Sequence, residues 1–179
     1  IWSPFLSLYY YPNWQNLDVS FYGIASHGFA PPTLEETLTP DGAINPDIQP
    51  ERGWNFEMGS RGALSDGKLL YNISIYSMQI RDLLVARRTD FDQFVGINAG
   101  KTIHNGLELS LSADLNYGEW SFQPFFYYTF SDYTFDEFID GEQDFSGNEL
   151  TGTARHIASA GVLFNCNGWY GNLNYQLVD

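Results

Sequence analysis

The chain has 179 residues and a formal net charge of -14, because 22 acidic residues stand against only 8 lysines and arginines. An acidic chain is poorly suited to bind the phosphate backbones of DNA or RNA. No run of about 18 apolar residues occurs, which excludes a membrane-spanning helix, and the single cysteine, Cys166, cannot form an internal disulfide. The aromatic content of 17% and the 17 glycines favour strands and turns.

Apolar and polar residues alternate with a period of two along much of the chain, which predicts an all-β protein. The clearest segment is 107–115, which reads LELSLSADL. In chain order, about eight strands are predicted near residues 1–10, 17–21, 54–58, 69–75, 107–115, 120–130, 158–164 and 169–177. The segment 120–130 alternates less cleanly, because Phe125 and Tyr127 stand at its polar positions.

The predicted connections between these strands alternate strictly between short and long. Short links at residues 12–15, 65–67, 116–118 and 167–168 contain the residue types that tolerate tight turns. Long polar connections lie at about residues 26–51, 82–102 and 131–155. Antiparallel barrels of the outer membrane have this asymmetry, with brief periplasmic turns and extended extracellular loops. The strands that begin at Leu17, Lys68 and Trp120 would then run outward.

Two soluble or self-contained architectures compete with a membrane barrel. A soluble antiparallel β-sandwich also has one packed and one wet face, and the many aromatic residues would suit it to carbohydrate. A small self-closing barrel of eight strands is the other alternative. Long connections fit a compact soluble domain less well, and Trp54, Trp120 and Trp169 near strand ends fit the interfaces of a membrane barrel. The pattern therefore favours a transmembrane barrel, whose polar interior is compatible with the mean hydropathy of -0.26.

Four short motifs resemble those of a known family. Residues 26–36 (SHGFAPPTLEE) are similar to a G-F-x-x-P-x-x-x-E/Q-L element, and residues 45–51 (NPDIQPE) to N-P-x-L-x-P-E. Residues 98–108 (NAGKTIHNGLE) are similar to N-x-G-x-x-x-x-G-x-E. Residues 146–152 (SGNELTG) are similar to G-N-x-L-P-G, with Thr151 in place of the usual proline. In this order and spacing they resemble the barrel of TonB-dependent outer-membrane receptors, in particular the iron-complex receptors of the Bacteroidetes type.

The resemblance implies a barrel of about 22 strands closed by an N-terminal plug domain. Neither a plug nor a terminal aromatic strand is found in the sequence, so residues 1–179 are expected to be part of the C-terminal half of the barrel, with the plug and the barrel ends absent. Eight strands of a large barrel would carry two unpaired edges, so this part is not expected to be stable alone in lipid.

The resemblance also implies a function without bond chemistry. A ferric chelate of siderophore or ferric citrate type would bind at the extracellular mouth and be imported with energy from the TonB complex, acting through the plug. Haem, cobalamin or an oligosaccharide is the alternative substrate. The expected surroundings are outer-membrane lipid and lipopolysaccharide, and no cofactor is expected.

Candidate ligand residues follow from what an anionic ferric chelate needs, which is guanidinium groups and flat aromatic rings. Catalytic and metal sites are not predicted, because no motif assembles a nucleophile and a base and the histidines lack metal-ligand spacing. The alternative for the arginines is pairing with lipopolysaccharide phosphates or with the acidic residues 132–144. The predicted substrate-binding residues are Arg87, Arg88, Arg81, Tyr133, Phe135 and His27, with Phe91 beside them.

Overall fold

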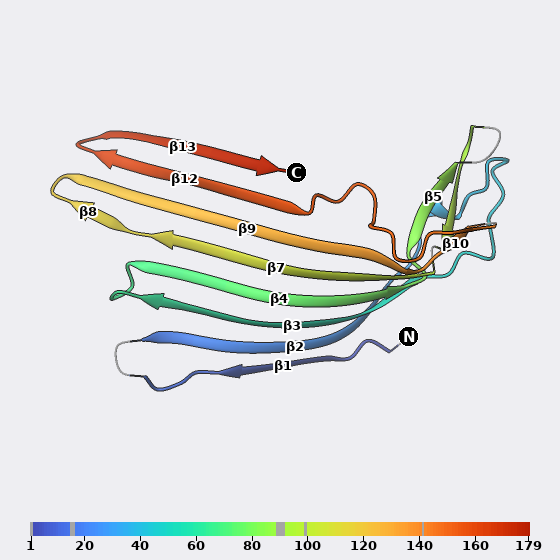
Figure 1. Ribbon diagram of the computed structural model, residues 1–179, viewed down its shortest axis with the longest axis horizontal. Helices are drawn as coiled ribbons and strands as arrows, with labels where there is room; N and C mark the ends of the chain where they lie inside the picture. Colours follow the sequence, from blue (N-terminus) through green and yellow to red (C-terminus); the bar gives the residue numbers. More distant parts are fainter. Residues whose placement is uncertain (1, 15–16, 89–91, 99, 141) are drawn as a thin grey trace.

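The computed structural model describes residues 2–14, 17–88, 92–98, 100–140 and 142–179, and most of these form one large antiparallel sheet, with two small hairpins apart from it (Figure 1). Successive long strands are neighbours throughout, as in a meander. They are β1 (Phe5–Tyr10), β2 (Asp18–Ala30), β3 (Glu51–Leu64), β4 (Leu69–Arg81), β7 (Lys101–Ala113), β9 (Trp120–Glu137), β12 (His156–Cys166) and β13 (Trp169–Val178). A short strand, β8 (Leu115–Tyr117), pairs with the beginning of β9. The predicted all-β class and its eight strands are confirmed.

Short turns gather at one end of the sheet and long connections at the other (Figure 1). Asn167 and Gly168 have φ angles of 46° and 82° and join β12 to β13 with Cys166 opposite Trp169. Two consecutive positive φ angles define the type I′ hairpin turn that Asn-Gly favours, so this turn is confirmed. The prediction at residues 116–118 is wrong by two residues, because Asn116 and Tyr117 pair in β8 and only Gly118 and Glu119 form the turn.

The long connections contain folded segments of their own. Helix α1 (Leu34–Thr37) follows β2, and a hairpin of β5 (Leu84–Arg88) and β6 (Phe94–Asn98) follows β4. A smaller hairpin of β10 (Ile139–Asp140) and β11 (Gln143–Asp144) follows β9. All of these lie at the end of the sheet away from the short turns (Figure 1). No helix of the described residues is long and apolar enough to cross a membrane.

The strands are longer than predicted at the loop end. Residues 26–30 and 131–137 were expected in loops, but they extend β2 and β9 and pair with the neighbouring strands, with one register shift between Lys101 and Thr102 opposite the end of β9. Strand pairing continues there because the backbone N–H and C=O groups still find hydrogen-bond partners on the adjacent strand. This holds even where apolar and polar side chains no longer alternate. His27, Tyr133 and Phe135 therefore lie on strands.

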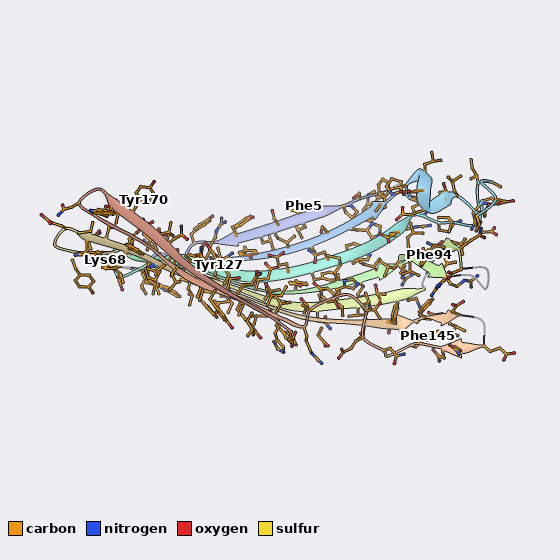
Figure 2. All side chains as sticks on the ribbon, turned by 90° about the horizontal axis from the view of Figure 1, so that it is seen from above. Phe5, Lys68, Phe94, Tyr127, Phe145 and Tyr170 are labelled. Atoms are coloured by element: carbon orange, nitrogen blue, oxygen red, sulfur yellow. The ribbon has the colours of Figure 1, made fainter. Side chains whose placement is uncertain are left out.

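The register separates the side chains into two faces. Glu57 of β3 lies between Ile24 of β2 and Tyr76 of β4, and Tyr76 lies opposite Gly106 of β7. Because successive residues of a strand point to opposite faces, these paired positions determine which side chains of each strand lie on the inner face and which on the outer face. The inner face carries Glu57, Ser74, Glu108, Ser110, Ser112, Gln123, Asn172 and Asn174. The outer face carries Phe56, Met58, Ile73, Ile75, Leu107, Leu109, Leu111, Phe126, Val162 and Leu173. Figure 2 shows side chains projecting from both faces of a twisted sheet.

The sheet is a single layer without an enclosed core. Val19, at 8% exposure, is the only buried hydrophobic residue among those described, whereas Leu173 is 70% and Trp169 is 81% exposed. No second sheet covers the outer face in the described part of the chain, which excludes the β-sandwich. The strands β1 and β13 stand at opposite edges of the sheet (Figure 1), so the small self-closing barrel is not formed either.

Aromatic rings lie over glycines on the inner face and cover the backbone. The pairs are Tyr22 over Gly59, Tyr76 over Gly106 and Phe125 over Gly161. A Cβ atom at Gly59 would approach the Tyr22 ring to 2.6 Å, so only glycine allows this close packing. Rings over strand glycines restore packing that the missing side chains would otherwise provide. This explains why Phe125 stands on the polar face, where its ring also lies 5.4 Å from that of Tyr127.

Candidate functional site

A cluster of hydrogen-bonding aromatic side chains lies on the inner face near the loop end. The hydroxyl groups of Tyr76 and Tyr133 are 2.7 Å apart, and each could donate to the other. The Tyr133 ring packs on His104, with ring centroids 4.4 Å apart, and His104 Nε2 is 2.9 Å from the hydroxyl of Thr102. Thr102 is 1% exposed. We call Tyr76, Thr102, His104 and Tyr133 the inner-face cluster; its chemistry is stacking and hydrogen bonding.

A second polar contact lies further along the inner face. The Tyr22 hydroxyl donates to Glu57 Oε1 at 2.8 Å. Both side chains come from neighbouring strands, β2 and β3, and Ser74 of β4, which is 4% exposed, is on the same face. The inner face is thus lined with hydroxyl and carboxylate groups along its length, as the polar lumen of a barrel requires.

The loop segments contact one another above the sheet. Nδ2 of Asn98 donates to the carbonyl oxygen of Gln49 at 3.0 Å, and Glu51 Oε1 accepts from the backbone N–H of Leu84 at 2.7 Å. Arg87 on β5 forms an ion pair with Asp140 of β10 at 2.6 Å. These contacts join the three long connections, which we call the loop platform.

Helix α1 is fixed to the loop platform by its own cap and by a glycine. Thr33 donates from its backbone N–H and its hydroxyl to Glu36 Oε2, at 2.7 and 2.8 Å. These hydrogen bonds, the backbone one first, hold the pKa of Glu36 below its ordinary value of 4.5. The carbonyl group of Glu36 lies against Gly96 of β6, where a Cβ atom would overlap it. A short helix is thereby positioned by a capping box and by close backbone approach.

Aromatic side chains also gather where β9 leaves the sheet. Phe135 stacks on Phe138 with centroids 4.9 Å apart, and Phe138 contacts Phe145 at 5.6 Å. The backbone of Phe135 bonds residues 147 and 148 of the returning loop. Phe135 lies two residues after Tyr133 on β9, so both are on the inner face, and Phe135 is opposite Thr102 of β7.

The structure brings some of the predicted ligand residues together and separates others. Tyr133 and Phe135 share the inner face, and Arg87 and Arg88 lie on the hairpin that rises from β4 and β7. Arg87 pairs with Asp140 and Arg88 with Asp92, so the predicted pairing of Arg87 with the acidic loop is present.

Two predicted residues lie elsewhere. Arg81 is in phase with Ile73 and Ile75, and His27 packs on Trp54 with ring centroids 5.1 Å apart, so both lie on the outer face. Their contact with a ligand stays a prediction. Phe91 lies outside the described residues.

Tyr76 and His104 were not predicted as site residues. His104 was considered only as a metal ligand, and in the described part of the chain no three His, Cys, Asp or Glu side chains gather to hold a metal. The available signal was its position in phase with Glu108 and Ser110 on the inner face.

A one-layer antiparallel sheet with an apolar outer face, a polar inner face, short turns at one end and folded loops at the other defines part of the wall of an outer-membrane β-barrel. The model of the family described as "TonB dependent receptor-like, beta-barrel" matches residues 1–179, and the chain belongs to this family of outer-membrane receptors, which are transporters and not enzymes.

Solved receptors are similar in fold. The alcaligin outer-membrane receptor FauA from Bordetella pertussis is 17% identical with a TM-score of 0.59, and the match covers 97% of this chain and 29% of that one. The FrpB iron transporter from Neisseria meningitidis is 16% identical with a TM-score of 0.60, and the match covers 97% of this chain and 26% of that one. The chain thus spans less than a third of the receptors it matches, and at these identities the likeness shows the fold.

Proposed function

We propose that this chain forms part of the barrel wall of a receptor that binds a ferric chelate at its extracellular mouth and imports it with TonB-derived energy. The observation that carries the proposal is the loop platform, where Arg87 and Arg88 stand on a hairpin above the strands that carry the inner-face cluster. Two proteins of similar structure, an alcaligin receptor and an iron transporter, support a ferric chelate as the substrate. Energy coupling would act through a plug domain of the whole receptor.

The chemistry of these side chains suits an anionic chelate. Guanidinium groups offer paired donors to carboxylate or catecholate oxygens, and the rings of Tyr133 and Phe135 offer flat surfaces for stacking. Asp140 and Asp92 form ion pairs with the two arginines. An anionic ligand would replace the two aspartates as the partner of Arg87 and Arg88. Because this attraction is between charges, ligand binding should weaken as the salt concentration rises.

The test is a titration of the full-length receptor in detergent with a panel of ferric chelates, haem, cobalamin and oligosaccharides. Replacing Arg87 and Arg88 by alanine should weaken the ferric chelate by at least about tenfold, because charged hydrogen bonds contribute about 1.5–3 kcal/mol each. The matched control is Arg52→Ala with Lys68→Ala, which removes the same charge from the outer face and from the turn end of the sheet and should leave binding unchanged.

Each outcome of the titration decides one part of the proposal. Binding of only haem, cobalamin or a sugar would keep the family and reject the ferric chelate. Tight chelate binding that survives loss of both hairpin arginines would keep the substrate and reject this part of the mouth. Equal weakening in both double variants would attribute the effect to net charge.

A further inference from the structure

Three cationic side chains form a row on the outer face at the loop end of the sheet. Arg52 of β3 lies opposite Arg81 of β4, and Arg81 lies opposite Lys101 of β7. Arg52 is in phase with Trp54, Phe56 and Met58, so the row belongs to the apolar face. The whole chain has only 8 lysines and arginines, and three of them occupy directly adjacent positions in an otherwise acidic protein. We call Arg52, Arg81 and Lys101 the basic row.

The positive charges of the basic row are only partly neutralised by nearby carboxylates. Lys101 pairs with Glu137 at 2.5 Å. Arg81 interacts with the same carboxylate of Glu137 at longer range. Neither Arg52 nor Arg81 forms a direct ion pair within the described residues, and like charges directly opposite each other on a sheet repel. An external anion between these two guanidinium groups would remove that repulsion.

The basic row lies at the level along the membrane normal where lipid headgroups are found. Strand β3 has 14 residues, with Arg52 next to its loop end and Leu64 at its turn end. At about 3.3 Å per residue and a tilt of about 40°, the span from Arg52 to Leu64 rises roughly 30 Å, slightly more than an apolar band of about 25 Å. Trp54, stacked at 5.8 Å on Phe56, lies immediately below Arg52, which is the usual level of interfacial aromatic residues.

An apolar groove opens on the same face below the basic row. It has a volume of about 420 Å³ and runs across β1 to β4, between Leu8, Phe56, Met58 and Ile75. Its floor includes Gly23 and Ala25, whose small size creates the hollow. A Cβ atom at Gly23 would meet nothing closer than the carbonyl oxygen of Glu57 at 4.0 Å, so the space is real and unfilled by the chain.

We propose that this part of the outer face is a binding site for a phosphorylated lipid of the outer leaflet, of the lipid A class. Its phosphate would lie on Arg52 and Arg81, with Lys101 beside them, and one acyl chain would occupy the groove. Charge complementarity selects the headgroup, since cationic side chains at the membrane surface attract anionic lipids. In this lipid site Arg81 has a role outside the ligand mouth. The lipid site depends on the membership of the outer-membrane family and does not depend on a ferric chelate as the transported substrate.

The test compares the full-length receptor with the variant Arg52→Gln/Arg81→Gln/Lys101→Gln, each reconstituted with bisphosphorylated lipid A, and measures retained lipid by native mass spectrometry. We expect at least about tenfold weaker retention in the variant, because each cation near the surface contributes several-fold. The matched control is Arg61→Gln/Lys68→Gln/Arg155→Gln, which removes three charges from the inner face, the turn end and the loop before β12 and should retain the lipid.

Further arms separate the phosphate from the acyl chain and from free phosphate. Gly23→Leu should fill the groove and weaken retention without any change of charge. Dephosphorylated lipid should bind the unmodified receptor as weakly as lipid A binds the triple variant, and inorganic phosphate alone should not compete. Unchanged retention in the triple variant, or equal loss in the control, would overturn the proposal. Chelate titration of the same variants keeps this outcome distinct from the proposed transport function.

Discussion

The hydroxyl groups of Tyr76 and Tyr133 meet at 2.7 Å across β7, and the Tyr76 ring covers Gly106, the residue of β7 that lies opposite Tyr76. The two tyrosines are on β4 and β9, which are not neighbours, so this contact ties together three strands on the inner face. In a single-layer sheet without a core, such bridges on one face supply packing that a second layer provides elsewhere.

The hydrogen bond between the two tyrosines should appear as coupling in a double-mutant cycle. Tyr76→Phe and Tyr133→Phe should each lower the free energy of unfolding of the full-length receptor in detergent by about 0.5–1.5 kcal/mol. The double variant should lose little more than either single one, because both remove the same bond. Tyr175→Phe on the outer face is the control, since its hydroxyl has no partner among the described residues. Strictly additive losses would mean that the bond contributes nothing.

The ring over Gly106 predicts a second effect on stability. Gly106→Ala places a methyl group inside the Tyr76 ring, and should lower the midpoint of thermal unfolding, with a cost of about 1–3 kcal/mol for overpacking. Gly28→Ala is the matched control, because a Cβ atom there meets nothing within 4 Å. The loss should shrink when Tyr76→Ala is added to Gly106→Ala. If Gly28→Ala destabilises as much, strand flexibility and not the ring explains the effect.

Much of the fold follows from the sequence, because a period of two and turn residues such as Asn167-Gly168 act locally. Arg81 and His27 lie on the outer face because β4 and β2 continue past the ends that were predicted for them. Arg81 continues the phase of Ile73 and Ile75, and His27 that of Phe21, so extending the alternation past residue 75 or 21 would have placed both on the outer face. The polar side chains at the loop ends of β2 and β4 are typical of loops, although the backbone of these residues continues to pair with the adjacent strands.

The inner-face cluster was beyond reach of the sequence, and for the loop platform the sequence indicated only that the hairpin arginines could pair with the acidic residues 132–144. Tyr76 and Tyr133 are 57 residues apart, and Arg87 and Asp140 are 53 apart. Nothing in the local pattern of either member identifies the other. Such pairs depend on the register across several strands, and a shift of one residue would move every side chain to the opposite face.

The capping box of α1 makes the loop platform sensitive to acid. The pKa of Glu36 is lowered in the folded protein, so its contribution to loop stability is fully present above the ordinary value of 4.5 and is lost as pH falls through the lower folded value. Pepsin cleavage near α1 should therefore begin only when the pH falls below 4.5. Thr33→Val removes the hydroxyl donor and leaves the backbone donor, so the pKa of Glu36, read from its carboxyl ¹³C shift, should move up toward 4.5. Thr37→Val is the control, because the Thr37 hydroxyl donates to Leu34 and not to Glu36. Equal shifts in both variants would show that general loosening of the helix, and not the cap, sets the titration.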